Sequence, residues 1–350
     1  MTHSLKRILW LALRLAVVIG LVAWVLSKMG GENVVQTAQR LADHWGWAVA
    51  ALGVALVQSP LGAIRLRMLL GVQGIHITFF ESLRLTYIGW FFSNLPLMPG
   101  STGGDFIKAY YIARHTHQKA EAVTIVFLDR FIGLIAMCML GAAAVALSLS
   151  DERMRIAQIA IGVFLGGAVL GGLVFYSRRL RVVLHLSRLV DRLPVAETIR
   201  KIGKAIFLYR WHKGKVLLTM VYSWGAQAAS VVVVCWLGIG LGSNLEWSQY
   251  FVIMPVIWIV SSFIPIPGAV GVAEAAFVYF FDSSVLGVPA DGAAELAFFM
   301  CLANRLVMTV ASLPGGVLYL LQRTHVSPAA MKAEMDRPEE GGPPEPPGSA

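Results

Sequence analysis

The sequence predicts an all-α polytopic membrane protein, with six spanning helices and two re-entrant helical hairpins in an inverted repeat. Three observations predict this class. Hydrophobic residues make up 57% of the chain and charged residues only 14%, with a mean hydropathy of +0.68, which leaves too little polar cover for a soluble domain. Two apolar stretches carry the same Pro-Gly break, and basic residues gather in only some of the connecting segments.

Six apolar runs are long enough to cross a bilayer, which takes roughly 20 residues. The first run follows Lys6 and Arg7 as a signal peptide would, but its length and the internal Arg14 favour a retained helix. We therefore expect spanning helices at about 8–26, 47–64, 122–149, 156–176, 216–238 and 293–321.

Two further apolar runs, about 82–107 and 250–281, are interrupted by Pro-Gly-x-x-Gly with a carboxylate just downstream. A helix broken by Pro and Gly leaves backbone groups unsatisfied, which is tolerated inside protein or along a wet cavity but not against lipid. Two matched breaks therefore indicate a site near the middle of the membrane. The motifs are Pro99-Gly100-x-x-Gly103-Gly104-Asp105 and Pro267-Gly268-x-x-Gly271-x-x-Glu274.

The distribution of Lys and Arg predicts the orientation, because basic short loops stay cytoplasmic. The stretch 177–215 holds eleven Lys or Arg residues against two carboxylates, and the stretch 65–84 is also basic. Both are expected to be cytoplasmic loops, and this requires each broken run to leave the membrane on the face that it entered. The first run then dips in from the cytoplasm and the second from outside, with both termini cytoplasmic.

The predicted organisation is one integral membrane domain, residues 1–322, followed by a tail, residues 323–350. Within the basic loop 177–215, charged and apolar residues alternate at helical spacing from Arg181 to Leu193, which predicts an interfacial amphipathic helix. The tail is rich in Pro and Glu and lacks apolar periodicity, so it is expected to be disordered and cytoplasmic.

Two spanning runs contain charged residues, as Asp129-Arg130 and as Asn304-Arg305. A charge at the centre of a membrane helix costs ~2.5–3.5 kcal/mol on insertion scales, so such residues face a partner or a water-filled cavity. One interpretation makes both arginines phosphate anchors, because guanidinium binds phosphate bidentately. The other is an internal ion-pair network, for instance Arg130 with Asp129 or Asp105, and Arg305 with Glu274.

The carboxylates after the breaks also have two interpretations. A restarting helix presents free amides that favour anions, but Asp105 and Glu274 can cap those amides themselves or carry a coupling proton or cation. Asn94 precedes the first break and can bond a freed carbonyl or a ligand. The candidate substrate-binding residues are Asn94, Gly100, Gly103, Gly104, Asp105, Asp129, Arg130, Pro267, Gly268, Gly271, Glu274, Asn304 and Arg305.

Signatures of other functions are sparse. The three cysteines lie in apolar runs, and the histidines lack the spacing of metal ligands. No Gly-rich phosphate loop and no nucleophile elbow is visible, so we expect no metal, no cofactor and no catalytic residue. The net charge of +9 collects beside apolar runs, which favours anionic lipid headgroups as partners over nucleic acid.

Four motifs in order resemble the flippase-like family, which is the transmembrane region of lysylphosphatidylglycerol synthase and its stand-alone relatives. The resemblance covers about 8–322 and implies a bacterial inner-membrane protein that moves lipids between leaflets. Only 29 residues follow Leu321, so the aminoacyl-transferase domain of the synthase is not expected. The motifs are Asn94-x-Pro96-x-x-Pro99-Gly100-x-x-Gly103-Gly104-Asp105, Leu128-Asp129-Arg130-x-x-Gly133-Leu134, Pro265-x-Pro267-Gly268-x-x-Gly271-x-x-Glu274 and Asn304-Arg305-Leu306.

Together these features predict a flippase that carries an anionic lipid, such as a phospholipid or a polyprenyl phosphate. The alternative is a non-transporting scaffold or accessory subunit that presents its basic loop to an enzyme of a phospholipid, hopanoid or polyprenyl-glycolipid pathway. The two hypotheses differ in where function resides, at the broken helices or at the loop 177–215.

Overall fold

The computed structural model describes residues 39, 42–94, 103–116, 119–147, 155–176, 212–263, 271–281, 283–286 and 290–321. Within these ranges the chain forms helices and turns and contains no strand, so the all-α class is confirmed for this part. The helices are α3 (Trp45–Val72), α4 (Phe79–Asn94), α5 (Gly103–Thr116), α6 (Lys119–Leu147), α7 (Arg155–Tyr176), α11 (Lys213–Gly240), α12 (Trp247–Phe263), α13 (Val272–Phe280), α14 (Ser283–Leu286) and α15 (Ala290–Leu320).

Four of the described helices, α3, α6, α11 and α15, are long and apolar enough to cross a membrane. They coincide with the expected runs 47–64, 122–149, 216–238 and 293–321, and α7 coincides with the run 156–176. The run 8–26, most of the loop 177–215 and the tail 323–350 lie outside the described residues.

The stretch 65–84 is largely helical and not the continuous loop that its charges suggested, whereas its cytoplasmic side stays a prediction. Helix α3 continues to Val72 because Leu66, Leu69 and Leu70 extend its buried face. The chain turns only at Gly74, where a φ of 77° requires a residue without a Cβ. Helix α4 then begins at Phe79, so Arg65 lies inside a helix that is long and apolar enough to cross a membrane.

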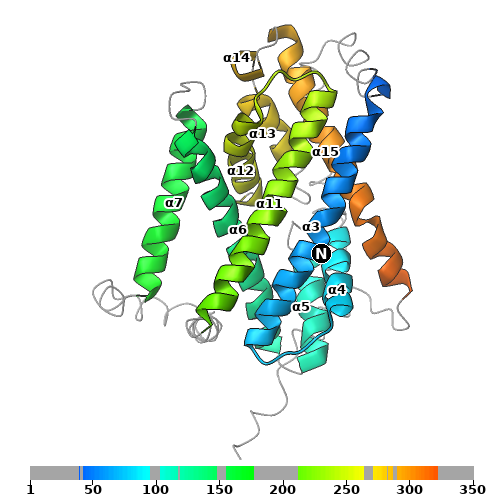
Figure 1. Cartoon of the computed structure of the whole chain (residues 1–350), viewed down its shortest axis with the longest axis vertical. Helices are drawn as coiled ribbons and strands as arrows, with labels where there is room; N and C mark the ends of the chain where they lie inside the picture. The colour runs from blue at the N-terminus through cyan, green and yellow to red at the C-terminus, as the bar shows by residue number, and fades with distance from the viewer. Residues whose placement is uncertain are drawn as a thin grey trace, which may run out of the picture.

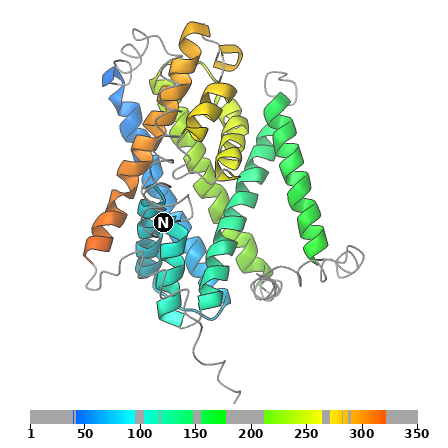
Figure 2. The same ribbon diagram turned by 180° about the vertical axis from the view of Figure 1, so that it is seen from behind.

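The helices form one bundle around the pair α3 and α11, which contact each other more extensively than any other pair (Figure 1). Helices α4 and α5 lie side by side in the lower half of the molecule, and α12 and α13 lie side by side in the upper half (Figures 1 and 2). Helix α7 packs on α6 and α12 at one edge. The two interrupted helix pairs therefore occupy opposite ends of the bundle.

Glycines hold α4 unusually close to two neighbours. A Cβ on Gly104 of α5 would overlap the Gly89 carbonyl oxygen of α4. A Cβ on Gly315 of α15 would likewise overlap the Tyr87 carbonyl oxygen. Small residues let membrane helices approach until their backbones are in contact, and α4 packs in this way against both α5 and α15.

Large apolar side chains cover the outward faces of the long helices, which suits a lipid environment. Val123 on α6, Val163 on α7, Leu217 on α11 and Val317 on α15 are all exposed. Polar side chains instead line a cavity between the helices, and this cavity is the candidate site.

Candidate functional site

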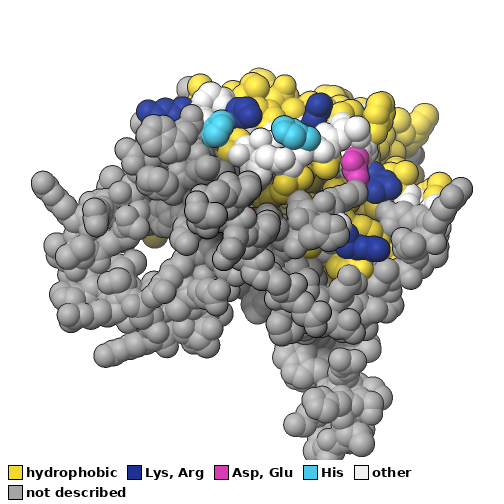
Figure 3. Space-filling model, turned by 90° about the horizontal axis from the view of Figure 1, so that it is seen from below, with side chains coloured by type: hydrophobic (Ala, Val, Ile, Leu, Met, Phe, Trp, Pro, Cys, Tyr) yellow, Lys and Arg dark blue, Asp and Glu magenta, His cyan; other side chains and the backbone are white. Residues whose placement is uncertain are grey.

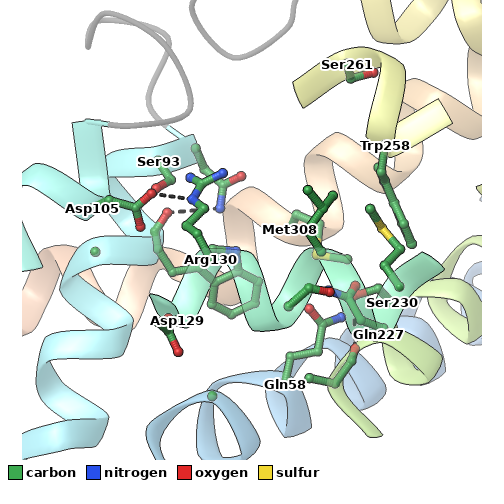
Figure 4. Close-up of a pocket in the computed structure, with 18 of the residues that line it drawn as sticks. Gln58, Ser93, Asp105, Asp129, Arg130, Gln227, Ser230, Trp258, Ser261 and Met308 are labelled. Carbon is green, nitrogen blue, oxygen red and sulfur yellow. Dashed lines mark hydrogen bonds and ion pairs between the residues drawn. The ribbon is translucent and has the colours of Figure 1, made fainter. Parts of the chain in front are cut away.

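A cavity of about 660 Å³ lies between helices from both ends of the bundle. Its lining residues come from α3, α4, α5, α6, α11, α12, α13 and α15, so both interrupted helix pairs border it (Figure 4). The volume suits a lipid headgroup, since small-molecule pockets hold ~300–1,000 Å³. The charged residues in its wall are Arg65, Asp105, Lys108, Asp129, Arg130 and Arg305.

The first ion pair joins α5 to α6 at the wall of the cavity. Asp105 lies in the first turn of α5, and the Arg130 Nε donates to its Oδ2 (Figure 4). The Arg130 side chain is 41% exposed, whereas that of Asp105 is 17% exposed. Arg130 therefore pairs with Asp105, one of the two carboxylates that the sequence offered as its partner.

The second ion pair joins α13 to α15. Arg305 Nη2 lies 2.8 Å from Glu274 Oε1. The other oxygen of Glu274 accepts a 2.6 Å hydrogen bond from the backbone N–H of Gly271, which has a φ of 85°. Glu274 thus caps its own helix and pairs with Arg305 at the same time, one oxygen for each role.

The two pairs have the same design. In each, the third residue of the helix that restarts after a break is a carboxylate, and its partner is an arginine in the next long helix. The interpretation of these charges as internal ion pairs is confirmed by these contacts. The ligand-binding interpretation is not excluded by them, because both arginines also line the cavity.

Asp129 makes a third, more buried cluster with two cations. Its Oδ1 lies 2.6 Å from Arg65 Nε, and its Oδ2 lies 3.8 Å from Lys108 Nζ. The side chain of Asp129 is 5% exposed and those of both cations are 13% exposed. Arg65 Nη1 also donates to the Ser223 hydroxyl at 3.2 Å, which fixes the guanidinium against α11.

Arg65 and Lys108 are not among the site residues predicted from the sequence, which put Arg65 in the basic stretch 65–84. One signal was available. Asp129 needs a cation inside the membrane, and Lys108 lies one helical turn after Asp105, on the same face of α5. Nothing comparable in the sequence identified Arg65.

The part of the cavity away from Asp105 and Arg130 is lined by uncharged polar groups. Gln58 of α3 lies beside Gln227 and Ser230 of α11 (Figure 4). The Gln227 Nε2 donates to the Gly133 carbonyl oxygen at 3.1 Å. These uncharged groups and the charged residues, which include Arg305, line the same cavity.

The predicted site residues fall into three groups. Asn94 lines the cavity, with its Nδ2 donating to the Trp90 carbonyl oxygen at 3.1 Å. Asn94, Asp105, Asp129, Arg130, Asn304 and Arg305 line the cavity; Gly103, Gly104, Gly271 and Glu274 form the helix starts beside it; Gly100, Pro267 and Gly268 lie outside the described residues.

Among the described residues, no group of His, Cys, Asp and Glu could hold a metal ion.

The formal charge of this site is positive. Counting the described lining residues and Glu274 behind Arg305, four cations face three carboxylates. Burying an uncompensated cation in a membrane protein is costly. The arrangement favours an anion in the cavity.

A comparison with known protein families identifies the family of this chain. The sequence model of the family described as the lysylphosphatidylglycerol synthase TM region matches residues 11–316, nearly all of the chain. Among curated proteins, no individual match was found. The matched residues include both interrupted pairs and all the described helices, with α15 matched as far as Gly316. The chain is therefore a multi-pass membrane protein that belongs to the family of the lysylphosphatidylglycerol synthase transmembrane region.

Proposed function

We propose that this protein is a flippase of the bacterial cytoplasmic membrane that moves an anionic, phosphate-bearing lipid between the leaflets. The observation that carries the proposal is the net positive cavity inside the helix bundle. Guanidinium groups bind phosphate oxygens bidentately, and Arg130 and Arg305 both line the cavity. The acyl chains stay in the bilayer, and the chain breaks no covalent bond of the lipid.

The proposed topology has six spanning helices, with α4/α5 and α12/α13 as re-entrant hairpins of an inverted repeat. Support comes from the two interrupted pairs at opposite ends of the bundle (Figure 1) and from their matching carboxylate–arginine pairs. Inverted repeats with broken helices at a central site are the architecture of many secondary transporters. The headgroup would reach the cavity alternately from either side.

The lower face of the molecule is proposed to be cytoplasmic. Seen from below, the described residues on this face include several Lys, Arg and His side chains and few carboxylates (Figure 3). Exposed Lys213 and Lys215 begin α11, and exposed Arg114 lies in the last turns of α5. Basic residues at one end of the spans favour the cytoplasmic side.

In the proposed transport step, the phosphate replaces a carboxylate as the partner of an arginine. Arg130 and Arg305 are already held by Asp105 and Glu274, so a bound headgroup must open at least one pair. Exchanging one anionic partner for another keeps each guanidinium paired throughout, which avoids the cost of an isolated buried charge. The two pairs lie at helix starts from opposite ends of the bundle, so opening one at a time would alternate access.

A leaflet-resolved lipid assay in reconstituted vesicles tests the proposal. The panel contains phosphatidylglycerol, an aminoacylated phosphatidylglycerol and a polyprenyl phosphate. Arg305→Ala should abolish translocation while the protein still folds, because it removes a phosphate anchor. The matched control is Arg67→Ala, since Arg67 is exposed on α3 and lines no part of the cavity. Normal lipid movement by Arg305→Ala would contradict the proposal.

The same assay separates the flippase from the scaffold alternative, in which an enzyme of lipid modification is the partner. That alternative requires the basic loop, so charge reversal at Arg181, Arg188 and Arg192 would abolish function in cells. It also predicts that purified vesicles show no lipid movement. Translocation by the purified chain, lost in Arg305→Ala and kept in the loop variant, would favour the flippase.

A further inference from the structure

The wall of the cavity contains polar atoms that lack partners. Among the described residues, Gln58 Nε2, Ser59 Oγ and Asn304 Oδ1 are closed off from solvent and make no hydrogen bond. All three residues line the cavity, and Ser59 is only 2% exposed. Buried polar groups are almost always paired, so three unpaired ones around one cavity point to a ligand.

These atoms come from helices that are packed firmly together. An apolar cluster including Ala55, Val233 and Ala303 joins α3, α11 and α15. Gln58 and Asn304 each lie within one turn of a member of that cluster. Gln58 and Asn304 are therefore set on a rigid part of the bundle, as a recognition site requires.

The chemistry of the three atoms selects the group that would pair with them. Gln58 Nε2 donates, Asn304 Oδ1 accepts, and the Ser59 hydroxyl does both. A phosphate only accepts and an ammonium only donates, so either leaves one of these atoms unpaired. A hydroxyl group both donates and accepts. Because each carboxamide carries a donor and an acceptor, this mixed character survives in either orientation of the amides.

We propose that the cavity reads its lipid at two points, the phosphate at the arginines and a headgroup hydroxyl at the unpaired polar atoms of Gln58, Ser59 and Asn304. Resting on the proposed function, this inference names the substrate class as phospholipids whose head alcohol is an uncharged polyol, such as glycerol, inositol or a sugar. In Figure 4 the Gln58, Gln227 and Ser230 group is separated from Asp105 and Arg130, with Met308 between them. Gln58 and Arg130 therefore line different parts of one cavity.

The test is a competition for binding to the purified full chain in detergent, with bound lipids identified by native mass spectrometry. Phosphatidylglycerol competes with phosphatidylmethanol, which has the same phosphodiester charge but no headgroup hydroxyl, and in a second arm with phosphatidylethanolamine. We expect the wild type to prefer phosphatidylglycerol by about tenfold in both arms, because a ligand without the hydroxyl leaves buried polar atoms unpaired.

The variants Gln58→Leu and Asn304→Leu replace the amides by apolar groups of similar size and should each reduce the preference over phosphatidylmethanol. The matched control is Gln73→Leu: Gln73 follows α3, its Nε2 is also buried and unpaired, and it lines no part of the cavity. This control should keep the wild-type preference, and melting temperatures establish that all variants fold.

Equal binding of phosphatidylglycerol and either competitor by the wild type would overturn the inference. So would a preference that survives in both cavity variants. The binding readout does not depend on transport, so a chain that prefers phosphatidylglycerol through these residues but moves no lipid would contradict the flippase and support the polyol site.

Discussion

Asp129 illustrates, at the scale of one residue, how this protein keeps a carboxylate inside a membrane helix. Two cations, Arg65 and Lys108, lie against its two oxygens, and all three side chains are nearly closed to solvent. Such a cluster contributes little net stability when intact, but it is costly to break, because removal of one member leaves the others buried without compensation. The carboxylate therefore holds α3, α5 and α6 in register around the cavity.

Replacing Asp129 by Asn should destabilise the protein by about 3–5 kcal/mol, because two buried cations lose their only strong anionic contact among the described residues. In detergent this corresponds to a melting temperature lower by roughly 10 °C. Adding Arg65→Gln should recover part of the loss, since paired charges are not additive. If the losses of stability in the two single variants simply added up in the double variant, the two residues would not be coupled. The control is Glu246→Gln, because Glu246 is exposed and directly precedes α12.

Some residues of the site could be predicted from the sequence and one could not, and the reason differs from residue to residue. Arg130, Glu274 and Arg305 were identifiable because a charge inside an apolar run must have a partner. Arg65 was not identifiable, because the side chain of a basic residue at the end of an apolar run can lie either outside the membrane or inside the helix bundle. The choice depends on where α3 ends and on which way it faces, and both are decided by packing against other helices.

At the scale of elements, the α4/α5 pair depends on contact at backbone distance. Gly104 sits where any side chain would meet the Gly89 carbonyl oxygen and the Ser93 hydroxyl oxygen. Asp105 is the next residue and holds Arg130. The closeness of the two helices therefore sets the position of the carboxylate at the cavity wall.

Gly104→Ala should push α5 away from α4 and weaken lipid movement, with a cost of about 1–3 kcal/mol in stability. Gly53→Ala is the matched control, because Gly53 is an exposed position on α3 where an added Cβ meets nothing within 4 Å. Melting temperature and leaflet-resolved transport measure the two effects. If both alanine variants behaved alike, the close contact would have no role in the site.

For the molecule as a whole, the sequence predicted the helices on both sides of each break and most of the described spans. Their length and apolar character alone require burial or lipid, so α6, α11 and α15 were found close to their observed bounds. How α12 and α13 pack on α6 and α15 was not predictable, because apolar faces of similar size leave the choice of neighbour to shape. The same holds for the cavity, which exists only where eight helices meet.

The proposed topology is testable by accessibility of introduced cysteines. Single cysteines are placed at His76, an exposed position before α4, and at Arg114, an exposed position in the last turns of α5. Both should react with a membrane-impermeant maleimide only from the cytoplasmic side. A cysteine at the exposed Asn244, before α12, should react from outside. The native Cys138, Cys235 and Cys301 are buried and can be replaced by alanine or serine first. Reaction of positions 76 and 114 from opposite sides would show that the first interrupted pair crosses the membrane.

The excess cation of the cavity has an electrical consequence under the proposed function. A membrane voltage acts on whichever charges move through it, by ~2.3 kcal/mol per elementary charge for each 100 mV. When a headgroup with one negative charge is bound, the four cations and three carboxylates of the described site are neutralised. The loaded protein would then change conformation almost unaffected by voltage, and the field would act on the return of the empty one.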